Sequence, residues 1–280
     1  MSTPFNITYS IQSSISAAFA YGKPVLLEGK LVTLDEFCAK VGLIYEWISG
    51  RPAVEVDCLV LHESKVVIFA FRGTSDLAGW MKDAEIAFQK YKLPNGKVIG
   101  IHSGFYSTVD AVFLRLAEIA VKAIAEGKKV YVDGHSKAAG EGVIFAGRLF
   151  WERGIKVEPM YVPGCPRTFN RAGQIAFEKI GLTLWRVLDE ADVVCRIPLA
   201  SLSWSWGVRF LQFYFAVGQT AFFNKWGNLA ENEPAFAHIP SDIACIISEA
   251  MRHKIALTND HGIGLYIQRQ IAYKEMMGLP

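Results

Sequence analysis

Short apolar segments rich in β-branched residues alternate with helical patterns along most of this chain. Parallel neighbouring strands need a crossover connection, and that connection is usually a helix. The alternation therefore predicts an α/β protein, with a mostly parallel central sheet and helices on both of its faces. The expected strands span residues 54–61, 66–71, 130–132, 157–162, 182–188 and 212–223, and the expected helices span residues 109–125, 138–150 and 173–179.

Residues 1–50 are expected to form a helical N-terminal extension, with helices at 11–20 and 34–49. The whole chain has 280 residues, which is close to the upper limit for one hydrophobic core. It shows no repeat, low-complexity tract or linker that would divide it. We therefore expect residues 1–280 to form a single domain.

The composition excludes several classes of protein. With 51% apolar and 20% charged residues, the chain can bury a core and is not disordered. Its 29 basic residues balance 27 acidic ones without forming a basic stripe, so no nucleic-acid partner is expected. The longest uncharged apolar stretch, 210–224, is shorter than the roughly 18 to 20 residues of a membrane helix. Its five cysteines are scattered and never spaced as CxxC, which argues against disulfide frameworks and zinc sites.

The first 22 residues lack charge, but they contain no basic region that would begin a signal peptide. With the scattered cysteines, this predicts a cytoplasmic protein, with non-classical export as the alternative.

A serine lies between an expected strand and an expected helix, in the segment Val130-Tyr131-Val132-Asp133-Gly134-His135-Ser136-Lys137-Ala138. This is the context of a nucleophile elbow, a tight turn that exposes a serine hydroxyl above a sheet. Gly134 and Ala138 are small, as the tight turn requires, although Ala138 departs from the usual glycine. Taken by itself, the segment could also be an ordinary Gly-Ser turn before a helix.

Further motifs flank this turn in a fixed order. Phe71-Arg72-Gly73-Thr74 and His102-Ser103-Gly104-Phe105 precede it, and Gly164-Cys165-Pro166-Arg167 and Asp192-Val193-Val194-Cys195-Arg196-Ile197-Pro198 follow it. Together they resemble the class 3, fungal-lipase-like family of the α/β-hydrolase superfamily, with its FRGT, VHxGF, GHSLG, GxPR and DIVPxLP motifs. The resemblance covers roughly residues 54–266 and implies an α/β-hydrolase fold.

A serine becomes nucleophilic when a base removes its proton, and this fold orders the triad as serine, acid and histidine. Asp192 matches the first position of the acid motif. His261 resembles the histidine of the family's terminal DH…Y motif, whereas His135 is expected to point away from the reacting centre and His102 matches a structural histidine. The resemblance thus implies Ser136, Asp192 and His261 as catalytic residues. The rivals are Asp189 and Glu190 for the acid and His238 for the base.

Two donors are expected to form the oxyanion hole. The first is the backbone N–H of Lys137, at the start of the helix after the serine. The second is Thr74, whose position matches the family residue that supplies a backbone N–H and a hydroxyl. The side chain of Lys137 is expected to be exposed to solvent and to have no catalytic role.

An amphipathic pattern follows Thr74 in residues 75–93, where apolar and charged side chains interleave. In the family this region often forms a lid or the rim of the acyl groove, so the pattern favours a helix that covers an apolar site. The lid or substrate-binding candidates are Leu77, Trp80 and Met81. A plain surface helix is the alternative.

The sequence predicts a serine hydrolase that cleaves carboxylic esters through an acyl-enzyme, as a lipase or esterase, with phospholipase A-type activity as one form. The alternatives are an amidase or acyltransferase with the same triad, and a non-catalytic lipase-like binding or structural protein. Ala138 and the loss of proline from the acid motif motivate the last alternative. No cofactor or metal is implied. The expected partner is an ester or lipid substrate, with peripheral contact to a membrane or lipid interface.

Overall fold

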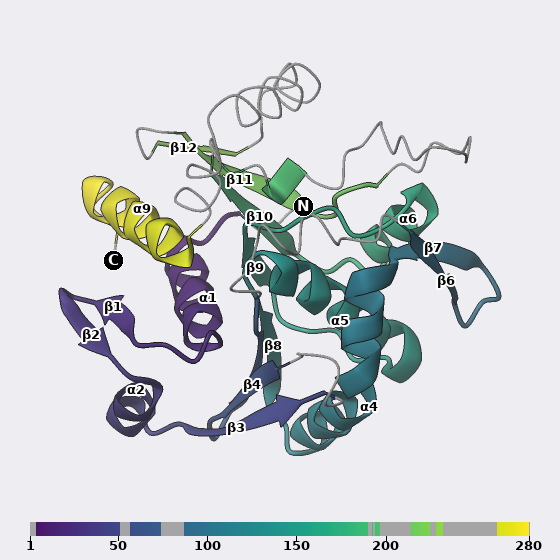
Figure 1. The fold of residues 1–280 in the computed structure, drawn as a ribbon, viewed down its shortest axis with the longest axis horizontal. Coiled ribbons are helices and arrows are strands. Elements are labelled where there is room, and N and C mark those ends of the chain that lie inside the picture. The colour runs from purple at the N-terminus through teal and green to yellow at the C-terminus, as the bar shows by residue number, and fades with distance from the viewer. Residues whose placement is uncertain are drawn as a thin grey trace.

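The structure is a computed structural model that describes residues 4–50, 57–73, 87–189, 192, 194–196, 214–224, 228–231 and 262–279. Within these residues, one four-stranded sheet has the order β3-β4-β5-β8 and a second has the order β12-β11-β10-β9 (Figure 1). The strands are β1 (Val25–Leu27), β2 (Lys30–Val32), β3 (Ile44–Ser49), β4 (Asp57–His62), β5 (Val66–Phe71), β6 (Phe88–Lys92), β7 (Val98–His102), β8 (Lys129–Asp133), β9 (Met160–Pro163), β10 (Leu184–Asp189), β11 (Gln219–Phe223) and β12 (Leu229–Glu231). The helices are α1 (Ile7–Phe19), α2 (Leu34–Val41), α4 (Ser103–Ala125), α5 (Lys137–Arg153), α6 (Arg171–Glu178) and α9 (Ile263–Met276).

The two sheets meet along β8 and β9. At the start of these strands the Glu158 N–H donates to the Val130 carbonyl at 2.8 Å, and just beyond their ends the Ser136 N–H donates to the Pro163 carbonyl at 3.2 Å. β8 and β9 therefore run in parallel, like the pairs β5–β8, β9–β10 and β10–β11. The carboxyl ends of these strands lie along one edge, where open α/β sheets carry their sites.

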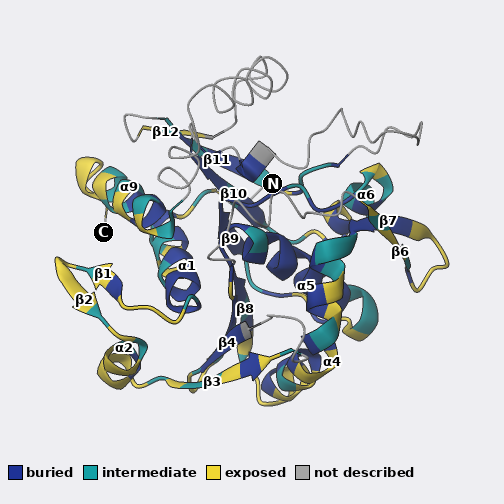
Figure 2. Ribbon diagram, in the orientation of Figure 1, coloured by how far each residue is buried: buried dark blue, intermediate teal, exposed yellow. Residues whose placement is uncertain are grey.

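Helices cover both faces of this arrangement (Figures 1 and 2). α1 and α9 contact each other on one face, where α1 also contacts β8 and β9, and α4 and α5 pack on the other face against β5 and β8. The core on the α5 side centres on Phe145, whose ring lies 5.3 Å from that of Phe69, 5.4 Å from that of Phe71 and 6.0 Å from that of Phe113. The predicted α/β class is confirmed. No described helix is long and apolar enough to cross a membrane.

The N-terminal prediction is wrong in its second half. The helix expected over 34–49 ends at Val41, because Gly42 adopts a left-handed conformation with φ of 73°. The chain then forms β3, which pairs antiparallel with β4. Residues 1–50 are therefore not a purely helical extension, since they supply an edge strand of the sheet together with α1.

The expected helix over 75–93 is also wrong at its end. Residues Phe88–Lys92 form β6, which pairs antiparallel with β7. The turn between them contains Asn95-Gly96, and Gly96 has a φ of 83°. Asn-Gly is a strong hairpin signal, so the hairpin could have been found from the sequence. Residues 74–86 lie outside the described part of the chain.

Asp133, the last residue of β8, is a buried carboxyl on the α1 face of the sheet. The Ser13 hydroxyl on α1 lies 2.6 Å from its Oδ1. Burial raises the pKa of Asp133 to about 6, against the hydrogen bonds from Ser13 and Ser16, which lower it. A raised pKa in the folded state means that the ionised carboxylate destabilises the fold.

Replacing Asp133 with Asn should therefore stabilise the protein at high pH. The carboxyl weakens the fold progressively as pH rises from about 4, where the unfolded chain ionises, to about 6, where the folded chain does. Asp133→Asn should raise the free energy of unfolding by up to about 3 kcal/mol at pH 8 and change it little at pH 4. Urea titrations at both values measure this, with the exposed Glu63→Gln as control. A difference independent of pH would contradict the prediction.

Candidate active site

Ser136 occupies a strained turn between β8 and α5. Its backbone angles are φ 64° and ψ −134°, in a region that side chains with a Cβ rarely adopt. Such a conformation costs about 1–3 kcal/mol and persists only where the surrounding structure enforces it. Here Gly134 makes it possible, because a Cβ at that position would lie 2.5 Å from the Ala138 carbonyl oxygen. Ala138 itself is fully buried in the core.

The hydroxyl of Ser136 is buried but makes no structural hydrogen bond to the described residues. The residue is 1% exposed, and its Oγ has no hydrogen-bond partner among the described residues. It does not cap α5, although Ser136 is the N-cap residue. A buried hydroxyl without a partner costs about 1–3 kcal/mol, so this position favours reactivity over stability.

The backbone N–H of Lys137 is the first of α5. The first N–H groups of a helix have no acceptor inside the helix, and the helix dipole favours negative charge at this end. Directly after Ser136, this N–H has the position required of an oxyanion donor.

The side chain of Lys137 differs from the prediction. Instead of lying in solvent it is 14% exposed, and its Nζ lies 2.7 Å from Oε1 of Glu141, one turn along α5 and 1% exposed. Thr108 on α4 donates its hydroxyl to the same oxygen of Glu141 at 2.5 Å. The expectation of a solvent-exposed lysine is therefore wrong, because a buried carboxylate needs a cation nearby.

His135 points toward the N-terminal segment, as expected for a residue that faces away from the reacting centre. Its Nδ1 lies 2.8 Å from the hydroxyl of Tyr21, just after α1. Burial, followed by the charge of Glu141, raises the pKa of Tyr21, which keeps the hydroxyl protonated. Tyr21 also lies against Gly73, which leaves no room there for a Cβ. Tyr21 thus packs against the turn at His135 on the side that faces away from Ser136.

Asp192 lies after β10 and is 1% exposed. Its Oδ1 accepts the Val194 N–H at 2.8 Å, and its Oδ2 accepts the Tyr266 hydroxyl at 2.5 Å. The thiol of Cys195 lies 3.3 Å from Oδ2 and 3.6 Å from the Tyr266 hydroxyl. Burial, together with the negative charge of Asp192, raises the pKa values of Cys195 and Tyr266 well above their usual range. Both groups therefore remain protonated and can donate to the carboxyl group of Asp192.

Asp189, the rival acid, has a different environment. It is the last residue of β10, and Arg269 on α9 forms an ion pair with its carboxylate. This contact joins the C-terminal helix to the sheet, which is a structural role. The environment of Asp192 differs, because hydroxyl, amide and thiol groups donate to its carboxyl oxygens.

Tyr266 connects the two halves of the site. Its hydroxyl contacts Asp192, and its ring lies 5.7 Å from the ring of His135, edge to face. The turn at Ser136 and the carboxylate of Asp192 therefore share a neighbour at the carboxyl edge of the sheet. Tyr266 is the tyrosine of the terminal DH…Y motif, and the sequence alone does not show that it contacts Asp192.

His102, the expected structural histidine, is also buried. Its ring stacks on Phe105 with 4.1 Å between centroids, and burial lowers the pKa of His102 to about 4. Seven other candidates lie outside the described residues, namely Thr74, Leu77, Trp80, Met81, Glu190, His238 and His261. In the part of the chain that is described, no group of three or more His, Cys, Asp or Glu could hold a metal ion.

A family model for class 3 lipases matches residues 68–202, which include the strained serine and Asp192. The predicted resemblance to the class 3 lipase family is thereby confirmed over these residues. The predicted enzyme class, a carboxylic ester hydrolase of the lipase type, is confirmed as well. A sequence comparison with curated proteins finds no match.

The chain is similar in fold to fungal lipases of known structure. A triacylglycerol lipase described as having a serine protease triad at its catalytic centre has a TM-score of 0.65 and 18% identity, with 92% of this chain and 95% of that chain covered. The Rhizomucor miehei lipase in a propeptide complex has a TM-score of 0.66 and 18% identity, over 92% and 80%. The lipase from Rhizopus microsporus var. chinensis has a TM-score of 0.62 and 18% identity, over 84% and 78%. The α/β-hydrolase fold is therefore confirmed.

Proposed function

We propose that this lipase-family protein hydrolyses carboxylic esters through an acyl-enzyme formed on Ser136. The observation that carries the proposal is the strained turn that holds an unpartnered serine hydroxyl at the start of α5. Strain and an unsatisfied buried hydroxyl both destabilise the fold, and they are typical of a nucleophile held in place for reaction.

In this mechanism His261 removes the Ser136 proton as the hydroxyl oxygen attacks the ester carbonyl. The Lys137 N–H and Thr74 stabilise the negative charge on the tetrahedral oxygen, each donor lowering the barrier by about 2.7–4 kcal/mol. The intermediate collapses when His261 returns the proton to the leaving alcohol. Water, activated by the same histidine, then releases the acid from the serine.

Asp192 orients His261 and stabilises its protonated form. The hydrogen bonds from Val194, Tyr266 and Cys195 support this role, because they fix the buried carboxyl group of Asp192 in one position. Asp189 is less suited, since Arg269 already compensates its charge.

The proposed substrates are esters with an apolar acyl chain, including lipids presented at an interface. Fold similarity to a fungal lipase studied as a model for interfacial activation supports this class, at a TM-score of 0.56 and 19% identity. An apolar interface would stabilise any exposed apolar face of residues 77–81, at about 25 cal/mol for each Å² removed from water.

A fluorophosphonate probe tests the proposal directly. The probe reacts with an activated serine and mimics the tetrahedral intermediate, so the folded protein should be labelled stoichiometrically on Ser136, as located by peptide mass spectrometry. Heat-unfolded protein should not be labelled, because the triad is no longer assembled. A folded protein that resists the probe would favour the non-catalytic alternative.

A further inference from the structure

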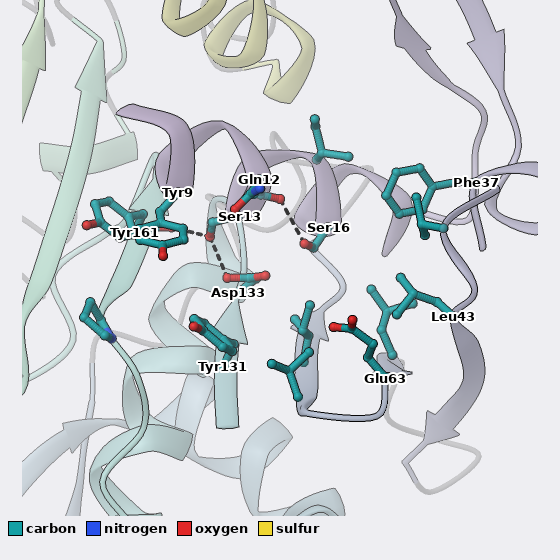
Figure 3. A pocket seen from close by; sticks show the side chains of 16 residues that line it. Tyr9, Gln12, Ser13, Ser16, Phe37, Leu43, Glu63, Tyr131, Asp133 and Tyr161 are labelled. Atoms are coloured by element: carbon teal, nitrogen blue, oxygen red, sulfur yellow. Dashed lines mark hydrogen bonds between the residues drawn. The ribbon is translucent and has the colours of Figure 1, made fainter. Parts of the chain in front are cut away.

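A cavity of about 520 Å³ lies between α1, α2 and the face of the sheet formed by β5, β8 and β9 (Figure 3). This volume is within the range of small-molecule sites in proteins, roughly 300 to 1,000 Å³. Ser136 is not among its lining residues, and α1 covers the sheet on the face opposite α5. The cavity is thus separate from the serine turn, and ester hydrolysis leaves it without a function.

The walls of the cavity are mostly apolar, with aliphatic and aromatic side chains that include Phe37, Leu43 and Ile68. Two carboxyl groups also line it: Asp133 at the end of β8 and Glu63 in the turn between β4 and β5. Among the described residues that line the cavity there is no lysine, arginine or histidine. The described part of the lining therefore carries negatively charged groups and no positively charged one.

Asp133 is the unusual member of this lining. It is 6% exposed, and its neighbours from α1 are the hydroxyls of Ser13 and Ser16, which carry no charge. A hydrogen bond to Ser13 could equally be made by asparagine, without the free-energy penalty of a buried carboxylate. The carboxylate is explained if a positive charge reaches it from the cavity. Figure 3 shows Asp133 in the middle of the labelled lining, between α1 and Tyr131.

Three tyrosines add to the preference for a cation. Tyr9, Tyr131 and Tyr161 all line the cavity near Asp133. The face of an aromatic ring attracts ammonium groups, and the attraction is strongest where water is excluded. The same rings and the aliphatic wall favour an apolar body on the ligand.

We infer that this cavity binds an organic amine with an apolar body, whose ammonium group pairs with Asp133 and whose body contacts the wall around Leu43 and Ile68. The pairing supplies the positive charge that the described lining lacks, and the Ser13 hydroxyl helps to hold the carboxylate in place. Neutral and anionic molecules of the same shape should bind less well, because they leave the carboxylate uncompensated or oppose it.

Three naphthalene compounds of similar shape test the inference on the full chain. These are 2-(aminomethyl)naphthalene, which is cationic at neutral pH, 2-(hydroxymethyl)naphthalene, which is neutral, and 2-naphthaleneacetate, the anion of 2-naphthaleneacetic acid. Isothermal titration calorimetry should show the amine binding at least about tenfold more tightly than the alcohol, the gain expected of a charge-assisted hydrogen bond. The acetate should bind most weakly. Equal affinity for amine and alcohol would overturn the inference.

Variants locate the site. Asp133→Asn keeps the shape of the side chain and should remove the preference for the amine while leaving alcohol binding unchanged. Ile68→Trp should fill the cavity and weaken the binding of both the amine and the alcohol. If Ile68→Trp does not fold, Ile15→Trp fills the cavity from the opposite wall. Ser136→Ala should bind all three compounds as the unmodified protein does. An amine preference that survives Asp133→Asn, or binding that survives a folded cavity-filling variant, would place the ligand elsewhere and overturn the inference.

Discussion

Ser136→Ala is expected to lower kcat for a short-chain aryl ester by about a million-fold, the loss seen when a triad nucleophile is removed. Only one hydroxyl is deleted, and that hydroxyl has no hydrogen-bond partner among the described residues. The fold should therefore remain intact, and the melting temperature should stay the same or rise. Initial rates with a chromogenic ester and a thermal melt of the same preparation measure both quantities.

Two further variants at serine positions sharpen this test. Ser136→Gly should be equally inactive but more stable by about 1 kcal/mol, because glycine tolerates the positive φ that serine adopts with strain. Ser10→Ala is the matched control, since Ser10 is also fully buried with an Oγ that has no partner among the described residues. It should keep full activity. Hydrolysis that persists in Ser136→Ala would exclude Ser136 as the nucleophile.

The turn around Ser136 could be predicted because its determinants are local. A strand, two small residues around a serine and a helix follow one another within a few residues, and the structure has them as β8, Gly134, Ser136, Ala138 and α5. The lysine–glutamate pair of α5 was missed, although its spacing of four residues is the usual one for a helical ion pair. The sequence contains both residues, but it does not show that Glu141 is buried.

The partners of the turn could not be predicted, because they come from distant parts of the chain. Tyr21 reaches His135 across 114 residues of sequence, and Ser13 reaches Asp133 across 120. Neither residue belongs to a motif, and helix periodicity says only which face of α1 is apolar. The supporting role of residues 1–50 depends on the tertiary packing of α1 against the sheet, which a single sequence does not specify.

The choice between Asp189 and Asp192 shows the same limit. The two residues are three positions apart and both follow an apolar strand, so spacing from the serine cannot separate them. Their side-chain partners in the fold distinguish the two carboxyl groups. Arg269 lies 80 residues beyond Asp189, and Tyr266 lies 74 residues beyond Asp192. Arg269 and Tyr266 lie only three residues apart on α9, where one forms an ion pair with Asp189 and the other donates a hydrogen bond to Asp192.

Asp192→Asn is expected to lower kcat by about ten thousand-fold, because an amide neither holds the catalytic histidine in the required tautomer nor stabilises its protonated form. Asn can still accept the Val194 N–H through a carbonyl oxygen at the Oδ1 position, and its amide N–H at the Oδ2 position can donate to the Tyr266 hydroxyl, which then acts as the acceptor. The melting temperature should therefore change little. The loss should appear in kcat more than in KM, since the charge of Asp192 acts on the transition state rather than on substrate binding.

Asp189→Asn is the matched control for this prediction, with the opposite pattern of effects. It removes the partner of Arg269, whose side chain is 19% exposed, and should lower the free energy of unfolding by about 2 kcal/mol, less than for a fully buried pair. Its kcat should stay within a few-fold of the unmodified protein, because the proposed mechanism uses Asp192 and leaves Asp189 in the ion pair with Arg269. If Asp189→Asn instead abolishes turnover while Asp192→Asn remains active, the two carboxylates exchange roles, and the ion pair with Arg269 becomes part of the catalytic centre. Measuring kcat and the free energy of unfolding on both variants decides between these arrangements. Loss of the catalytic carboxylate should lower kcat and leave stability unchanged, whereas loss of the ion-paired carboxylate should lower stability and leave kcat unchanged.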